Sequence, residues 1–337
     1  MKKLTVFVIA LISVCFVYSK NDPTGKYKVI NKISLEGNER WDYLFSDDQG
    51  ARLYVSHGNQ VQVIDEVTGK VIGKITGLKG VHGIAIDPAL DKGFITNGKD
   101  SSVTIFNTKT FEVIKRVVIT GVNPDAILYD AFSQKVFVFN GHSNNITVLD
   151  AASNKIVATI PLTGNPEFAV TNLKGLIYVN LESSGCIAMI NATTYKVEKV
   201  WSIAPGTEPS GLAFDNETQR LFSVCANKLM MVVNAKSGKV LAKLPIGEGT
   251  DGAGFDPYFK CAYSANGDAT MTVVREDAND SFRVVENVPT HKGARTIAVN
   301  KLTHHIYLPS ADFEEAAAGK RGKLIPGTFV ILEIAGM

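Results

Sequence analysis

The stretch TEPSGLAFDNETQRLFSVCANKLMMVVNAKSGKVLAKLPIGEG, residues 207–249, contains four short apolar or alternating runs separated by turn residues. A Pro/Gly entry precedes the first run, an Asp-containing turn follows it, and a Gly-Lys turn precedes the fourth. Four strands of this length, joined by such turns, form one antiparallel sheet of about 40 residues. Recurrence of such a unit at this period is typical of a β-propeller.

The same pattern recurs along the chain. The repeats begin near residues 41, 81, 122, 165, 207, 250 and 294, and their second strands read LYVSH, FITN, FVFN, IYVN, LFSVC, AYSAN and IYLPS. A lone four-stranded sheet is marginally stable, whereas packing of each blade against its neighbours supplies a core. We therefore predict an all-β fold, a seven-bladed β-propeller of four-stranded antiparallel blades.

The two ends of the chain are expected to meet in the seventh blade. The seventh repeat stops after its third strand, FVILEI (329–334). NDPTGK (21–26) resembles DEVTGK (65–70), a turn from a third to a fourth strand, and residues 26–36 follow as a fourth strand would. We predict that this N-terminal strand completes the last blade and removes an exposed sheet edge.

Residues 1–19 have the features of a secretory signal peptide. Lys2 and Lys3 precede an uncharged apolar run, and small residues suited to cleavage lie near Ser19. The run is too short for a comfortable membrane span. We therefore expect a periplasmic or secreted protein whose mature part, residues 20–337, is one propeller with no membrane span.

A lipid anchor at Cys15 is the alternative to cleavage. Val14 argues against it, because a lipobox has a small residue at that position. Outside the leader three cysteines remain, so at least one of them cannot pair within the chain. Cys186 and Cys225 fall near the same edge of neighbouring repeats and can bridge, but buried free thiols fit the pattern at least as well.

The composition limits the partners of the protein. A formal net charge of +2 over 337 residues leaves no electrostatic footprint for nucleic acid or an anionic membrane. We expect a monomer whose partner is a small polar ligand or another protein.

The sequences of the second strands resemble those of a known family. FITN (94–97) and IYVN (177–180), with the following VQVID, VTIFN and ITVLD runs, resemble the YVTN repeat of YncE-like seven-bladed β-propellers. The resemblance covers essentially the whole mature chain and implies the fold. It does not imply one activity, because lactonases, redox-associated propellers and binding proteins share this architecture.

One residue of each repeat is expected at the mouth of the central channel. Alignment of the first strands on their closing turns places none but polar residues there: Asp42, His82, Asp125, Glu167, Ser210, Asp251 and Arg295. With histidine neutral, this ring carries a local charge of about −3. Converging acids repel one another and raise their pKa values unless a cation is present.

Several occupants fit such a ring. A divalent cation such as Ca²⁺ or Mg²⁺ would be held by Asp42, Asp125, Glu167 and Asp251, and an organic cation or a polyhydroxylated ligand suits the same oxygens. His82 also suits a transition metal or the role of a general base. The alternative to a ligand site is a water-filled channel with a structural role only, in which Arg295 pairs with its acidic neighbours Asp251 and Asp42.

Other candidates lie around the mouth. Trp41 is the aromatic residue best placed to cover a ligand. The alternative is a structural role, in which Trp41 packs between blades. The second strands end on a further ring, in which Asn97, Asn140 and Asn266 each precede Gly, as in tight hairpin turns. His57 breaks that pattern and is a weak ligand candidate. The loop 311–328 is longer than its counterparts and is a candidate lid or docking segment.

Two functions of different class follow. The first is an exported binding or scaffold protein that holds its ligand at the channel mouth. The second is a metal-assisted hydrolase of the lactone type, in which His82, Asp125 or Glu167 would activate water beside a bound cation. Phosphate-binding loops, HExxH and GxSxG motifs are absent from the sequence.

Overall fold

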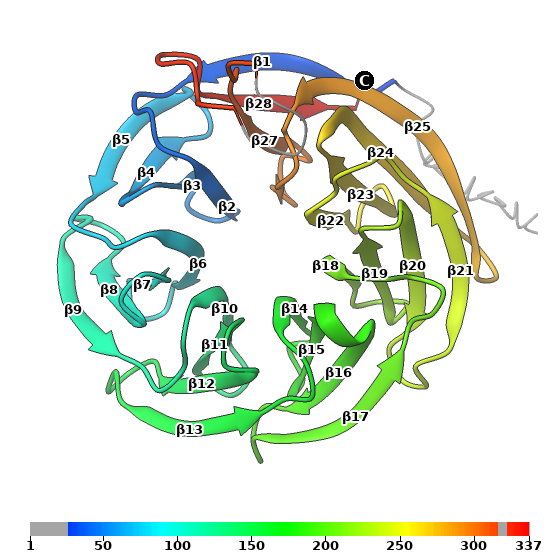
Figure 1. Cartoon of the computed structure of the whole chain (residues 1–337), viewed down its shortest axis with the longest axis horizontal. Coiled ribbons are helices and arrows are strands. Elements are labelled where there is room, and N and C mark those ends of the chain that lie inside the picture. Colours follow the sequence, from blue (N-terminus) through cyan, green and yellow to red (C-terminus); the bar gives the residue numbers. More distant parts are fainter. Residues whose placement is uncertain (1–25, 316–321, 337) are drawn as a thin grey trace, which may run out of the picture.

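The protein is a ring of seven four-stranded antiparallel sheets (Figure 1), seen in a computed structural model that describes residues 26–315 and 322–336. This arrangement confirms the predicted seven-bladed β-propeller. The proposed signal peptide and Cys15 lie outside the described residues. Within the described ranges, no helix is long and apolar enough to cross a membrane.

In each blade the first strand lines the channel, and the later strands lie progressively farther from it. The first strands are β2 (Trp41–Asp47), β6 (Val81–Asp87), β10 (Pro124–Asp130), β14 (Pro166–Thr171), β18 (Pro209–Asp215), β22 (Gly252–Asp256) and β26 (Ala298–Val299). The second strands are β3 (Arg52–His57), β7 (Lys92–Asn97), β11 (Lys135–Asn140), β15 (Leu176–Leu181), β19 (Arg220–Cys225), β23 (Cys261–Asn266) and β27 (Ile306–Ser310).

The outer half of each blade completes the sheet. The third strands are β4 (Gln60–Asp65), β8 (Ser102–Asn107), β12 (Asn145–Asp150), β16 (Cys186–Asn191), β20 (Leu229–Asn234), β24 (Asp268–Asp277) and β28 (Val330–Ala335). The fourth strands are β5 (Lys70–Ile75), β9 (Val113–Val118), β13 (Ile156–Pro161), β17 (Lys196–Ser202), β21 (Val240–Pro245), β25 (Ser281–Lys292) and β1 (Lys28–Ser34). A 3₁₀ turn, η1 (Glu182–Ser184), joins β15 and β16.

Burial explains the sequence pattern of each strand. Middle strands such as β12 are buried on both faces against neighbouring blades, which accounts for their nearly continuous apolar runs. Outer strands such as β13 alternate between exposed and partly buried residues. The apolar core lies between blades. In one cluster Phe94 and Ile105 of blade two pack with Val138 and Leu149 of blade three.

The last blade is closed by the N-terminal strand, as predicted. Its strand order is β1-β28-β27-β26, and β1 pairs antiparallel with β28, so that Val29 lies opposite Ile334. Figure 1 shows β1 along the outer edge of this blade. Tyr27, just before β1, donates its backbone N–H to Glu286 Oε2 at 3.0 Å in blade six.

The three described cysteines are free thiols. Cys225 and Cys261 are buried and Cys186 is half-buried. The bridge that the sequence left open between Cys186 and Cys225 is therefore not formed.

Candidate functional site

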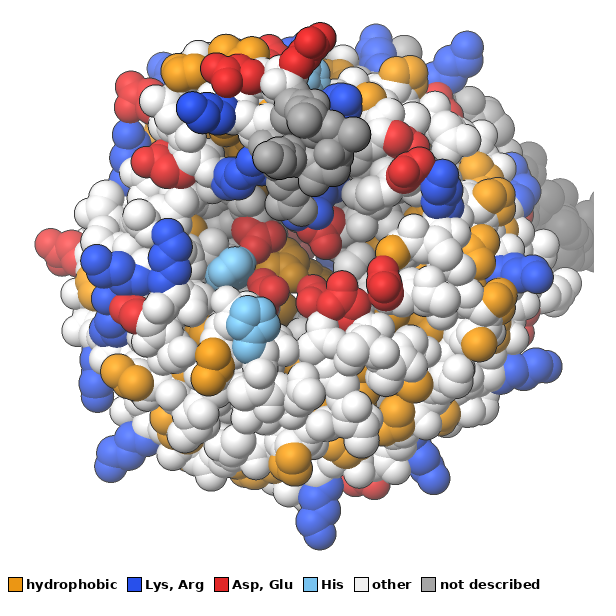
Figure 2. Space-filling view, in the orientation of Figure 1, with side chains coloured by type: hydrophobic (Ala, Val, Ile, Leu, Met, Phe, Trp, Pro, Cys, Tyr) orange, Lys and Arg blue, Asp and Glu red, His pale blue; other side chains and the backbone are white. Residues whose placement is uncertain are grey.

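The predicted mouth residues lie at the start of the first strands. Asp42, His82, Asp125, Glu167 and Ser210 are each the second residue of such a strand, while Asp251 and Arg295 precede β22 and β26. Figure 2 shows acidic side chains and a histidine gathered around a central hollow.

A β-bulge aims these side chains at the channel. In blade one the pairing jumps from Trp41–His57 to Leu44–Val55, so that Asp42 lies in the bulge. The same irregularity occurs in blades two to five. Because a bulge breaks the alternation of a strand, it can redirect a side chain toward a site.

Hydroxyl groups of second strands support the bulges. Ser56 Oγ accepts the N–H of Asp42 at 3.1 Å and donates to the carbonyl oxygen of Tyr43 at 2.9 Å. Thr96 Oγ1 donates to the carbonyl oxygen of Asp125 at 2.6 Å and so joins blades two and three. Sequence reasoning missed this support, although Ser56 and Thr96 stand at the same position of their strands.

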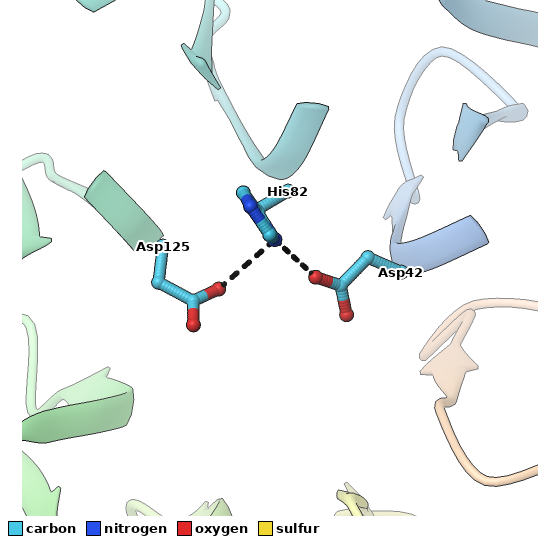
Figure 3. A group of neighbouring side chains, drawn as sticks. All are labelled: Asp42, His82 and Asp125. Carbon is cyan, nitrogen blue, oxygen red and sulfur yellow. Dashed lines mark hydrogen bonds and ion pairs between the residues drawn. The ribbon is translucent and has the colours of Figure 1, made fainter. Parts of the chain in front are cut away.

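Three of the mouth residues form a close cluster (Figure 3). His82 Nδ1 lies 2.5 Å from Asp42 Oδ2, within hydrogen-bond distance, and 3.6 Å from Asp125 Oδ1. Burial alone would lower the pKa of His82, but the hydrogen bond to Asp42 and the charges of both carboxylates outweigh it, and the pKa is raised.

Asp125 is the least satisfied member of the cluster. Burial, followed by the nearby charge of Asp42, raises the pKa of its carboxyl group to about 7. Its Oδ1 atom is buried and has no hydrogen-bond partner among the described residues. His82 Nδ1 faces this oxygen at 3.6 Å, too far for a hydrogen bond, and a buried carboxylate oxygen without a hydrogen bond is costly.

Other blades contribute further titratable groups to the mouth. Burial, and then the charge of Asp125, raises the pKa of Glu167 to about 9. Arg295 Nη2 lies 3.4 Å from Asp251 Oδ2, one of the two acidic neighbours, Asp251 and Asp42, with which the water-filled channel alternative paired it.

The cluster has the donor set of a metal site. One ligand atom each from Asp42, His82 and Asp125 lies within 4.8 Å of the others. An imidazole nitrogen with two carboxylate oxygens suits a divalent transition metal. Glu167 and Asp251, which we also predicted as metal ligands, are not members of this cluster.

A glycine makes room for His82. A Cβ atom built on Gly98 would lie 2.6 Å from His82 Nε2 and 2.9 Å from Asn123 Oδ1. At Gly141, the corresponding residue of the next blade, the nearest atom would be 3.8 Å away. The corresponding glycine of blade three therefore lacks this close approach.

Aromatic side chains form the floor of the mouth. The rings of Tyr43 and Phe168 lie with their centroids 5.5 Å apart. Burial, followed by the charges of Asp125 and Asp42, raises the pKa of the Tyr43 hydroxyl. Hydrophobic side chains are visible deep in the hollow, behind the acidic ones (Figure 2).

His57 does not face the mouth. Its side chain is buried, its Nε2 lies 2.7 Å from the carbonyl oxygen of Glu39, and its Nδ1 lies 3.0 Å from Gln62 Nε2. Burial lowers the pKa of the imidazole. Because both ring nitrogens have partners, His57 has no nitrogen free for a ligand and holds the loop before β2 in place.

The Asn-Gly pairs are not tight hairpin turns, contrary to the expectation from sequence. Asn97, Asn140 and Asn266 end buried strands, and positive φ angles occur later, at Ser101, Asn144 and Ala269. Asn97 shows why the residue is there: its side chain accepts the N–H of Lys79 at 3.0 Å and donates to Thr104 Oγ1 at 3.0 Å. The buried amide therefore fastens a loop to the sheet.

Trp41 packs beside the mouth. Its ring stacks on Phe329 at a centroid distance of 5.0 Å and contacts Phe313 at 5.9 Å. It also lines a hollow of about 850 Å³ with Arg295 and part of the long loop. The described part of that loop is folded back by an antiparallel bridge between Phe313 and Leu324.

Comparisons with known proteins agree on the fold. No protein-family model matches the chain, and a search of curated proteins finds no match. Among solved structures, Kuenenia stuttgartiensis hydrazine synthase is similar with a TM-score of 0.70 and 17% identity, over 81% of this chain and 94% of that one. The protein U3-55K is similar with a TM-score of 0.77 and 9% identity, over 91% and 99%. At these identities the likeness concerns architecture alone, and this chain is a seven-bladed β-propeller.

Proposed function

We propose that this propeller is a binding protein whose site is the channel mouth, and that Asp42, His82 and Asp125 hold a divalent metal ion there. The observation that carries the proposal is the buried Oδ1 atom of Asp125, which lacks a hydrogen-bond partner beside a second carboxylate. A bound cation would supply that partner and would offset the burial and the charge of Asp42 that raise the pKa of Asp125.

The donor set narrows the choice of ion. Zn²⁺ and similar transition ions accept imidazole nitrogen together with carboxylate oxygen, whereas Ca²⁺ prefers six to eight oxygens. Three protein ligands leave at least one coordination position open. A small polar ligand with a carboxylate, hydroxyl or carbonyl oxygen would bind through that position, which is how the site would combine metal and ligand binding.

Hydrolysis at the same mouth is the second candidate, and lactones are the substrate class we propose for it. Glu167 favours it, because this acid belongs to the same ring but not to the cluster, so it can activate water while Asp125 holds the ion. Binding remains the preferred function, because it requires only the cluster itself.

The family and location of the protein are also proposals. The YVTN-like sequences of the second strands support a YncE-like propeller, and residues 1–19 support export to the periplasm or the medium. Neither proposal is needed for the metal site.

Metal content and calorimetry test the proposed function. The purified protein, stripped with a chelator, is titrated with Zn²⁺, Mn²⁺, Ca²⁺ and Mg²⁺. We expect one transition ion per chain in the wild type and at least tenfold weaker binding in Asp125→Asn and Asp42→Asn. Ser210→Ala, a change in the same ring but outside the cluster, should bind as the wild type does. Absence of stoichiometric binding, or equal loss in all three variants, would rule the site out.

A further inference from the structure

The central channel contains a second cavity below the mouth. It has a volume of about 390 Å³ and is lined by apolar side chains of the first strands, among them Phe45, Leu128, Phe168, Val170, Phe214 and Val299. We call this cavity the lower channel. Its volume lies within the range of small-molecule pockets, which are mostly apolar with a few polar groups.

The lower channel is separated from the carboxylates of the mouth. Tyr43 and Phe168 line the lower channel and directly follow the mouth residues Asp42 and Glu167 in their strands, so they mark the end of the lower channel nearest the mouth. At its other end the lining includes residues of the turns after the first strands, Asp48, Leu173, Asn216 and Lys301. Leu173 is 54% exposed, so the lower channel opens on the face opposite the mouth.

The charges at this opening balance one another. Asp48 and Lys301 are the two charged residues of the lining. The backbone N–H of Lys301 donates to Asp48 Oδ1 at 3.0 Å, and the two side-chain charges attract one another. An opening without net charge gives no preference to an anion or a cation, so charge complementarity favours an uncharged occupant.

The chemistry of the lining indicates the class of that occupant. Water is poorly held where few polar partners are available, and apolar cavities take apolar molecules instead. We propose that the lower channel binds a small, uncharged, apolar molecule. This inference is independent of the metal site, because none of the three cluster residues lines the lower channel.

The face around the opening supports entry of such a molecule. Turns between first and second strands carry exposed apolar side chains on this face: Leu90, Phe132, Leu173, Tyr258 and Leu302. Equivalent turns from five blades therefore contribute apolar side chains to the face on which the lower channel opens. A ligand leaving water would meet apolar contacts before it enters the lower channel.

A fluorescence titration with N-phenyl-1-naphthylamine tests this proposal. The probe is uncharged and becomes fluorescent in apolar surroundings. We expect saturable binding of one probe per chain, displacement by 1-decanol, and at least tenfold weaker binding in Val170→Glu, which places a carboxylate in the lower channel. Leu302→Glu, on the surrounding face, should retain binding, as should Asp125→Asn at the mouth.

The outcomes separate the alternatives. Lack of saturable binding to the wild type would overturn the proposal, and so would equal loss in Val170→Glu and Leu302→Glu, because the probe would then bind the surface. Circular dichroism checks the fold of each variant. If Val170→Glu does not fold, Ala253→Phe, which fills the lower channel, takes its place with the same expected loss.

Discussion

Asp42 and His82 join two neighbouring blades at the channel mouth, because Oδ2 of the aspartate and Nδ1 of the histidine lie 2.5 Å apart. Each residue comes from the first strand of its own blade, so the contact depends on how the blades are placed and not on either strand alone. The position of Asp125 on the other side of His82 makes the same histidine the centre of a cluster from three blades.

The free energy of unfolding should fall as the pH rises through this cluster in metal-free protein. The pKa of Asp125 is about 7 in the folded protein, above its ordinary value of 3.8, so the folded state retains a proton that the unfolded state loses. Stability is therefore lost progressively between about pH 4 and 7. The raised pKa of His82 acts in the same direction, since its contribution is lost as the pH rises through the folded value.

Thermal melting in chelator at pH 5 and pH 8 measures this effect. We expect the melting temperature of the wild type to drop more than that of Asp125→Asn, by several degrees, since about 1 kcal/mol corresponds to roughly 2–4 °C in a large domain. Glu112→Gln, which removes an exposed acid, should follow the wild type. Parallel pH profiles of the wild type and Asp125→Asn would contradict the prediction.

Metal binding should release protons. A cation at the cluster must displace the protons held by Asp125 and His82, whose pKa values are both raised. Affinity should rise up to about tenfold per pH unit and per proton displaced between pH 5 and 7. Calorimetry in buffers of different ionisation enthalpy counts these protons, and a count of zero at pH 6 would show that the ion binds elsewhere.

Gly98→Ala should weaken metal binding while its counterpart does not. The new Cβ atom would lie 2.6 Å from His82 Nε2 and force the imidazole away from Asp42. Gly141→Ala is the matched control, because its Cβ atom would have 3.8 Å to the nearest atom. We expect about a tenfold loss of affinity in Gly98→Ala alone, measured by titration, and similar affinities in both variants would mean that His82 tolerates displacement.

Strand β1 allows a matched test of ring closure. Ile33 is 7% exposed and packs with Phe329 and Ile331, whereas Ile30 of the same strand is 44% exposed. Ile33→Ala should lower the free energy of unfolding by about 2–5 kcal/mol, the usual cost of a large-to-small core change. Ile30→Ala should cost much less. Urea denaturation compares the two, and equal losses would mean that β1 contributes little through its buried face.

The fold was predictable because the same sequence pattern recurs in each blade. Alternating runs, Asp or Asn turns and the incomplete seventh repeat are local signals, and they suffice to count the blades and to pair the N-terminal strand with the last one. The polar residues of the mouth could be named for the same reason, since equivalent positions in a repeat occupy equivalent places in the ring.

The chemistry of single residues was less accessible. The burial of His57 and the role of Asn97 depend on contacts with loops outside their own strands, and such contacts leave no periodic signal. The raised pKa of Asp125 depends on the depth of the mouth and the distance to Asp42, which sequence spacing does not contain. Sequence therefore located the ring, and three-dimensional packing selected the cluster within it.

The pairing of β1 with β28 also sets an order of folding. Among the described strands β1 comes first in the chain, and its partner β28 comes after all the others. Blades one to six can form as soon as their own strands exist, but the hydrogen bonds that complete the circle must wait until β28 has been made. Contacts of such sequence separation form slowly. Until they form, β1 presents an unpaired edge, and this interval is when the nascent protein is most exposed to association with other chains.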